Sequence, residues 1–212
     1  MLTVYHLGVS QSDRIIWLLE ELQLPYRMEW FDRLESGLAP PEYKALHPVA
    51  TAPTIRDGDT VMCESVAIIE YIINRHGGGR LGVAPDRDNY ADYLYWLNAG
   101  SALMSAMGAV LMAKMIAPDT AEDSIYFKAN LDRQKRYLGH MEQRLGESEY
   151  LAGPEFTGAD IMNMFALTTM PVFGGPKVDH LPNISRFIEK ISQRPPYQKA
   201  MSIAGPETKR PA

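Results

Sequence analysis

The residues best suited to binding chemistry lie between positions 49 and 71. Pro53 precedes a β-prone run, Asp57-Gly58 separates that run from a second one, and Glu64-Ser65 opens a helical pattern. At a helix start, the hydroxyl of Ser65 and the free backbone amides suit a carboxylate, and the Glu64 carboxylate can accept from an amine. The order of these features predicts a site for a short peptide with charged ends. The simpler interpretation of Ser65 is an N-cap, and we expect it to cap as well.

A second group of hydroxyls lies near the N-terminus. Ser10 and Ser12 come directly before apolar residues at helical spacing, which predicts a helix over 13–23. A hydroxyl at this end of a helix can stabilise an anion. Ser10 and Asp13 also fit a capping box, so capping is the plainer interpretation of Ser10.

The first 79 residues predict the elements that must position these groups. We expect strands over 3–5 and 26–31, one helical turn over 42–45, a hairpin at Asp57-Gly58 and a helix over 65–75. Gly77 to Gly79 then stop this helix. The predicted unit is α/β with a mixed four-stranded sheet.

The remaining chain predicts helices only. Residues 80–88 are expected to form a linker and 89–212 an all-α helical bundle domain, with long helices over 89–116 and 124–145. Thr157 and Asp160 predict a capping box before the apolar run 161–170. A further helix reaching residue 193 is expected to end at Pro195-Pro196.

Composition narrows the function classes. The net charge of −5 and the lack of a Lys/Arg run argue against nucleic acid as a partner. No apolar run approaches a membrane span, and the first residues lack the basic segment of a signal peptide. Cys63 is the single cysteine, expected to be a buried small hydrophobe, and no histidine spacing suits a metal. We therefore expect a cytoplasmic protein without membrane association or metal.

Three motifs in order resemble the glutathione S-transferase family, in its bacterial, serine-type, cytosolic branch. Residues 10–22 (SQSDRIIWLLEEL) are similar to the serine-type active-site turn and first helix. Residues 47–55 are similar to the turn that ends in a cis-proline, and residues 64–68 (ESVAI) to the Glu-Ser-x-Ala-Ile signature. Residues 93–97 resemble the opening of the long helix in a bacterial and fungal subgroup. The resemblance implies a thioredoxin-like domain, a helical domain and a homodimer.

The resemblance also implies glutathione as co-substrate. Its contacts would be Thr51, Ala52, Pro53, Glu64 and Ser65. A cis Pro53 would leave the Ala52 backbone free to pair with the peptide. Many relatives have Lys, Arg or Gln where Thr51 stands, so we expect weaker binding of the distal carboxylate unless Lys44 or Arg33 supplies the charge.

Ser10 is implied to be the catalytic residue, as a hydrogen-bond donor to sulfur. A free thiol has a pKa of about 8.5, and a donated hydrogen bond lowers it. Ser12 is the second candidate because it also lies at the helix start. Tyr5 is the third, because other branches use a tyrosine from the end of the first strand. The thiolate would then attack an apolar electrophile, as in detoxification.

The long helix is predicted to supply the second-substrate pocket. Met104, Met107, Leu111 and Met115 recur there at helical spacing, although core packing is the plainer interpretation of this stripe. The predicted pocket residues are Met104, Met107 and Leu111 with the interleaved small residue Gly108. Two other functions stay open. One is a non-catalytic carrier of glutathione or hydrophobic ligands, and the other is a dedicated pathway enzyme such as an isomerase, dehalogenase or β-etherase.

Overall fold

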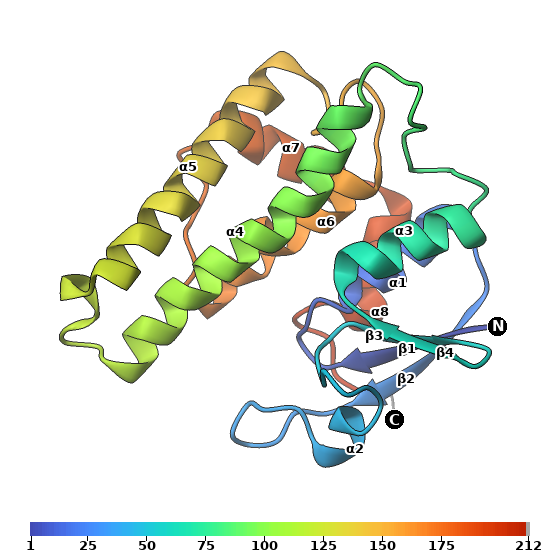
Figure 1. Ribbon diagram of the computed structural model, residues 1–212, viewed down its shortest axis with the longest axis horizontal. Helices are drawn as coiled ribbons and strands as arrows, with labels where there is room; N and C mark the ends of the chain where they lie inside the picture. Colours follow the sequence, from blue (N-terminus) through green and yellow to red (C-terminus); the bar gives the residue numbers. More distant parts are fainter. Residues whose placement is uncertain (211–212) are drawn as a thin grey trace. The chain divides into compact units, whose positions relative to one another are not determined.

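The computed structural model describes residues 1–210 as two compact units, which are treated separately below (Figure 1). The first comprises Met1–Gly82 with the chain from Ile191 onward, and the second comprises Val83–Lys190. The predicted division into 1–79, 80–88 and 89–212 assigned the whole C-terminal chain to the helical domain. The contacts instead group the chain from Ile191 with the first unit.

The first unit is built on a four-stranded mixed sheet in the order β2-β1-β3-β4. β1 (Leu2–Leu7) is parallel to β2 (Tyr26–Phe31) and antiparallel to β3 (Thr54–Asp57), which pairs with β4 (Thr60–Cys63). The parallel pair requires a crossover, which α1 (Asp13–Leu22) supplies. The predicted mixed sheet is confirmed.

The hairpin turn lies one residue later than predicted. Asp57 pairs with Thr60, so the two turn residues are Gly58 and Asp59. Gly58 has φ of 58°, in the left-handed region that glycine adopts without a steric penalty. Cys63, at the end of β4, is buried as predicted, and its Sγ lies 3.4 Å from Nδ1 of His47.

Three further helices complete this unit: α2 (Pro41–Lys44), α3 (Ser65–Arg75) and α8 (Pro195–Ala204). α8 packs against α1, and the ring of Tyr197 meets Trp17 edge-on at 4.9 Å between centroids. Pro195 and Pro196 were expected only to end a helix, but they also begin α8. Proline fits there because the first helical N–H groups need no intrahelical partner.

The second unit is helical, as predicted. It contains α4 (Tyr90–Ile116), η1 (Ala121–Asp123), α5 (Ile125–Glu147), α6 (Gly158–Thr168) and η2 (Met170–Phe173), and α7 (Pro182–Ser192) begins in it. α4 packs against both α5 and α6. The approach to α6 is close, since a Cβ added at Gly100 would lie 2.9 Å from Cγ of Met162.

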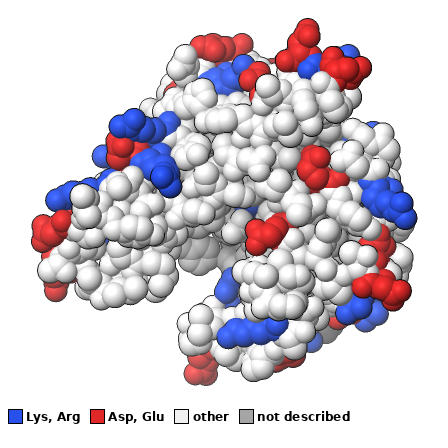
Figure 2. All heavy atoms as spheres, viewed as in Figure 1, with Lys and Arg blue, Asp and Glu red and all other residues white. Residues whose placement is uncertain are grey.

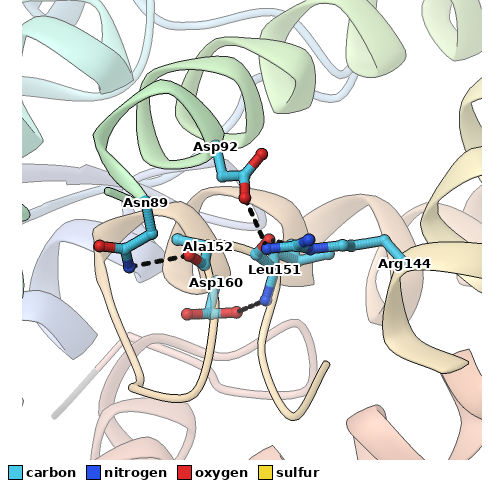
Figure 3. A network of polar contacts seen from close by, with 6 residues as sticks. All are labelled: Asn89, Asp92, Arg144, Leu151, Ala152 and Asp160. Atoms are coloured by element: carbon cyan, nitrogen blue, oxygen red, sulfur yellow. Dashed lines mark hydrogen bonds and ion pairs between the residues drawn. The ribbon is translucent and has the colours of Figure 1, made fainter. Parts of the chain in front are cut away.

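The predicted capping box starts α6. Asp160 is fully buried and accepts hydrogen bonds from the backbone N–H of Leu151 at 2.9 Å and of Thr157 at 2.8 Å. Further contacts tie the same loop to α4 and α5 (Figure 3): Asn89 to the Ala152 carbonyl at 2.9 Å, and Arg144 to Asp92 at 2.8 Å and to the Leu151 carbonyl at 2.9 Å. Asp160 therefore fixes both the first turn of α6 and the loop before it.

α4 departs from one expectation about apolar runs. It is 27 residues long, and an 18-residue window within it has a mean hydropathy of 1.5. By length and composition it could cross a membrane, whereas we expected no run of that kind. Core helices of soluble proteins pass the same test.

Candidate functional site

A chain of hydrogen bonds joins the two candidate serines to a histidine on β1. Ser12 Oγ lies 2.8 Å from Nδ1 of His6 and 2.8 Å from Ser10 Oγ. Ser10 Oγ in turn donates to the Leu7 carbonyl at 2.7 Å. The three polar side chains are buried, with exposed fractions of 0% for His6 and Ser12 and 6% for Ser10. Of the two serines, only Ser10 retains some exposed surface.

One arrangement of hydrogens satisfies all three contacts. The Leu7 carbonyl can only accept, so Ser10 donates to it, Ser12 donates to Ser10, and His6 donates to Ser12. In the other tautomer, Ser10 would face two acceptors with one hydrogen. The buried Nε2–H of His6 would also lack an acceptor, since Nε2 has no partner within residues 1–210. We therefore assign the Nδ1–H tautomer from the network.

His6 is held neutral by its surroundings. Its ring lies 4.4 Å from Trp30 between centroids. Burial lowers the pKa of the His6 imidazole from 6.5 to about 4, and the positive charge of Arg33 is a second cause. At neutral pH, His6 is therefore a hydrogen-bond donor to Ser12 and carries no charge.

Arg33 holds the turn that precedes Ser10. Its guanidinium donates to the carbonyls of Gly8 at 2.8 Å and Val9 at 3.0 Å, and to Gly37 at 2.8 Å. Sequence reasoning considered Arg33 only as a charge for glutathione. Within residues 1–210, the backbone N–H groups of Val9, Ser10 and Gln11 donate no hydrogen bond. The turn thus presents unpaired amides around the Ser10 hydroxyl.

The alternative roles weighed for these hydroxyls differ in the structure. The N-cap of α1 is Ser12, without a side-chain cap bond, so Ser10 and Asp13 form no capping box. The Tyr5 hydroxyl accepts from Nε of Arg56 at 2.9 Å, and its ring packs edge-on against Phe31. Tyr5 is therefore occupied in the sheet and core of the first unit.

The predicted glutathione residues before β3 surround a cis peptide bond between Ala52 and Pro53. The Ala52 backbone makes no hydrogen bond within residues 1–210, so its N–H and carbonyl are unpaired. The Thr51 carbonyl accepts from Thr54 Oγ1 at 2.8 Å and from the buried Tyr43 hydroxyl at 3.4 Å. These bonds fix the Thr51 backbone, and its exposed side chain stays unpaired within the described chain.

Glu64 and Ser65 begin α3, with one change from the prediction. Glu64 is the N-cap residue and Ser65 the first helical residue, so the expectation that Ser65 caps was wrong. The hydroxyl of Ser65, a residue 6% exposed, makes no hydrogen bond within residues 1–210, and the Glu64 side chain is exposed. Both groups, with the unpaired amides of the first turn, remain available to an anion and an amine.

The four residues predicted for the second-substrate pocket lie on two faces of α4. Met107 and Leu111 line a cavity formed by second-unit residues, and Met104 and Gly108 do not. A Cβ added at Gly108 would meet no atom within 4 Å. One and two turns further along the same face, Met112 and Met115 are 51% and 69% exposed. The face of α4 that carries Met104, Gly108, Met112 and Met115 is therefore not part of the core.

Comparison with known proteins agrees with this architecture. The sequence matches the glutathione S-transferase N-terminal domain over residues 10–75 and the C-terminal domain over 103–195. A solved glutathione S-transferase from Actinobacillus pleuropneumoniae is 34% identical, with a TM-score of 0.87, over 98% of this chain and 95% of that one. Glutathione S-transferase 3 of Schizosaccharomyces pombe is 29% identical over 92% of this chain and 84% of its own length.

A glutathione transferase family member from Pseudomonas fluorescens, solved with two glutathione bound, shares the fold. Its TM-score is 0.75 at 23% identity, over 94% of this chain and 92% of that one. The sheet, the helical unit and these matches define a thioredoxin-like unit followed by a helical one. The chain belongs to the glutathione S-transferase family.

Proposed function

We propose that the first unit binds glutathione and that Ser10 stabilises its thiolate, which attacks an apolar electrophile. The observation that carries the proposal is the chain from His6 through Ser12 to Ser10, in a turn whose amides are unpaired. The Ser10 hydroxyl and the unpaired amides of the turn would be the donors to a bound thiolate, and a thiolate is stabilised by such donors.

In this proposal, bound thiolate attracts the hydrogen that Ser10 otherwise donates to Leu7. The Ser10 oxygen continues to accept from Ser12, and this bond polarises the Ser10 hydroxyl. His6 holds Ser12 in the donating orientation and exchanges no proton. Sulfur then forms a bond to the electrophile, and the leaving group or the adjacent atom takes the electron pair. Met104 and Gly108 remain the predicted contacts of that electrophile.

The ends of glutathione would be held as the resemblance implied. Glu64 and Ser65 would bind the amine and carboxylate at one end, and the unpaired Ala52 backbone would pair with the extended peptide. Arg33 keeps its charge while it donates to three carbonyls, and Lys44 is exposed. Both cations therefore remain candidates for the charge beside Thr51.

The direct test replaces Ser10 with Ala and follows turnover, glutathione affinity and the pKa of bound glutathione. Losing one donor to a developing anion lowers kcat by about 100-fold or more. Calorimetry should give nearly unchanged glutathione affinity, and thiolate absorbance against pH should show a raised thiol pKa. Ser12→Ala should lower turnover less than Ser10→Ala, because it removes the bond that polarises Ser10 but leaves the Ser10 hydroxyl itself. Full activity in Ser10→Ala would refute the catalytic assignment.

One observation favours a carrier without catalysis as the second candidate. Ser10 is only 6% exposed, and its hydrogen already has an acceptor at 2.7 Å. A carrier of this kind would bind glutathione without lowering the pKa of its thiol. We also propose that the protein is cytoplasmic and forms a homodimer. Sedimentation of the purified protein tests the homodimer.

A further inference from the structure

Two consecutive peptide units before Ser10 are held by one side chain. Nε of Arg33 donates to the Gly8 carbonyl at 2.8 Å, and Nη2 of the same guanidinium donates to the Val9 carbonyl at 3.0 Å. Its Nη1 donates to the Gly37 carbonyl at 2.8 Å. Because the guanidinium is planar and rigid, it fixes the positions of these three oxygens relative to one another.

These bonds decide where two amides of the turn point. The Gly8 carbonyl shares a peptide unit with the N–H of Val9, and the Val9 carbonyl shares one with the N–H of Ser10. Both peptide bonds are trans, and in a trans peptide the carbonyl and the N–H point in opposite directions. Since both carbonyls are turned towards Arg33, the N–H groups of Val9 and Ser10 point away from it. Neither amide donates a hydrogen bond within residues 1–210.

The backbone of this turn is in an unfavourable conformation. Val9 has φ of 49°, which a β-branched residue rarely adopts unless the surrounding structure enforces it. Successive N–H groups in a turn of this kind form a concave site for an anion. The bonds from Arg33 therefore keep the turn in its strained conformation before an anion binds.

Arg33 also brings a positive charge to this turn. Within the described chain it forms no ion pair, and its charge is the second cause, after burial, of the lowered pKa of His6. The net charge of the whole chain is −5, and Lys and Arg side chains lie among Asp and Glu on the face shown in Figure 2. An anion at this turn therefore depends on a nearby cation more than on the field of the whole molecule.

We infer that Arg33 is a positioning residue of the proposed reaction, which aims the amides of Val9 and Ser10 at the sulfur of glutathione and adds a positive charge to the same site. The inference rests on the proposed function, since these amides act on sulfur only if the thiolate lies at Ser10. Arg33 acts through the turn and exchanges no proton. It lowers the pKa of the bound thiol and leaves binding of the rest of the peptide unchanged.

The test compares Arg33→Gln with the wild type in the full-length protein. The pKa of bound glutathione, read from thiolate absorbance against pH, should rise by about one unit. The value of kcat should then fall about tenfold near neutral pH and approach the wild-type value at high pH, where the thiol ionises without help. Affinity for S-methylglutathione, which has no thiol proton, should change by about twofold or less, because its other contacts are retained.

Two further variants separate the geometry of Arg33 from its charge. Arg33→Lys keeps the positive charge but replaces the rigid fork with a single ammonium group, so it should also raise the pKa of the bound thiol, by less than Arg33→Gln does. If Arg33→Gln does not fold, this milder variant decides the test. The matched control, Arg27→Gln, removes the same charge from β2, where Arg27 pairs with Glu29 at 3.3 Å, and should behave as the wild type.

Three outcomes would overturn the positioning role. Wild-type behaviour in Arg33→Lys would show that charge alone suffices. A loss of kcat by the same factor at every pH, or a loss of Tm without a shift in the thiol pKa, would make Arg33 structural. Weaker binding of S-methylglutathione without that shift would show that Arg33 holds the peptide directly.

Ser10→Ala distinguishes failure of this inference from failure of the proposed function. An unchanged thiol pKa in Ser10→Ala refutes the proposed function. A raised thiol pKa in Ser10→Ala, with none in Arg33→Gln, refutes the role of Arg33 alone.

Discussion

Three residues with a positive φ each come directly before a predicted site residue. Val9, Ala50 and Glu64 have φ of 49°, 56° and 75°, and they come directly before Ser10, Thr51 and Ser65. Such conformations cost about 1–3 kcal/mol in non-glycine residues and persist where the surrounding structure enforces them. Their positions support the view that the fold is constrained at these points to aim backbone amides outward.

His6 gives a prediction about acid stability. Its pKa is about 4 in the folded protein and 6.5 ordinarily, so the unfolded chain binds the extra proton between these values. The free energy of unfolding should be unaffected by His6 above pH 6.5 and fall as the pH drops towards 4, by at most about 3 kcal/mol. Urea unfolding at pH 7 and near pH 4 measures this loss.

The variants His6→Gln and His180→Gln test whether His6 causes this loss of stability between pH 7 and pH 4. His6→Gln removes the buried titrating group and should show a shallower loss, whereas exposed His180→Gln should follow the wild type. Parallel loss of stability in all three proteins would show that His6 does not titrate as described.

The sequence identified Ser10 and Ser12 but not the residues that orient them. His6 lies on a strand and Ser12 at a helix start, so no single periodicity links the two. Arg33 reaches the turn from 24 residues away through backbone carbonyls, which any residue type provides. The sequence did contain one indication of this role: His6 lies within a β-prone run, directly before the turn that carries Ser10.

At the scale of elements, prediction succeeded where local chemistry fixes an end. The bounds of β2 and α3 were predicted as they occur, because a proline, a turn or a glycine run delimits them. α8 was missed as a separate helix because Pro195-Pro196 was interpreted only as a stop. Proline both ends one helix and begins the next, and the sequence pattern does not show which role applies.

The prediction at the scale of elements concerns the cap at the start of α6. Asp160→Ala removes a fully buried acceptor and leaves the N–H of Leu151 unpaired (Figure 3). It also leaves the N–H of Thr157 unpaired. Losing a cap and a buried network of this kind should lower the free energy of unfolding by about 2–4 kcal/mol. Chemical denaturation measures it. Asp132→Ala, which removes an exposed ion pair with Arg136 on α5, should change it by about 0.5 kcal/mol or less. A similar small loss for Asp160→Ala would contradict the role of the cap.

At the scale of the whole molecule, residues 194 and 199 form ion pairs with α1 in the first unit. Glu21 on α1 is 5% exposed at its side chain and accepts two hydrogen bonds from Arg194, both at 2.7 Å, across 173 residues. Lys199 pairs with Glu20 at 2.7 Å beside it. Sequence patterns could not predict this pairing, because charge spacing reports only neighbours along one helix. The helix that follows the proposed catalytic turn is therefore held by Arg194 and Lys199, which are distant from it in the sequence.

Arg194→Met tests this dependence. It retains much of the apolar stem but leaves the buried Glu21 carboxylate with only the Trp17 indole N–H, at 2.9 Å, as a partner among the contacts described. An uncompensated buried charge should cost about 3–5 kcal/mol of unfolding free energy. Adding Glu21→Gln removes the charge and should restore part of the loss, so the double variant should be more stable than Arg194→Met alone. Thermal unfolding of the four proteins in this cycle measures the coupling. If the two losses simply add, the pair contributes nothing to closing the first unit, and packing of Tyr197 on Trp17 holds the C-terminal chain instead.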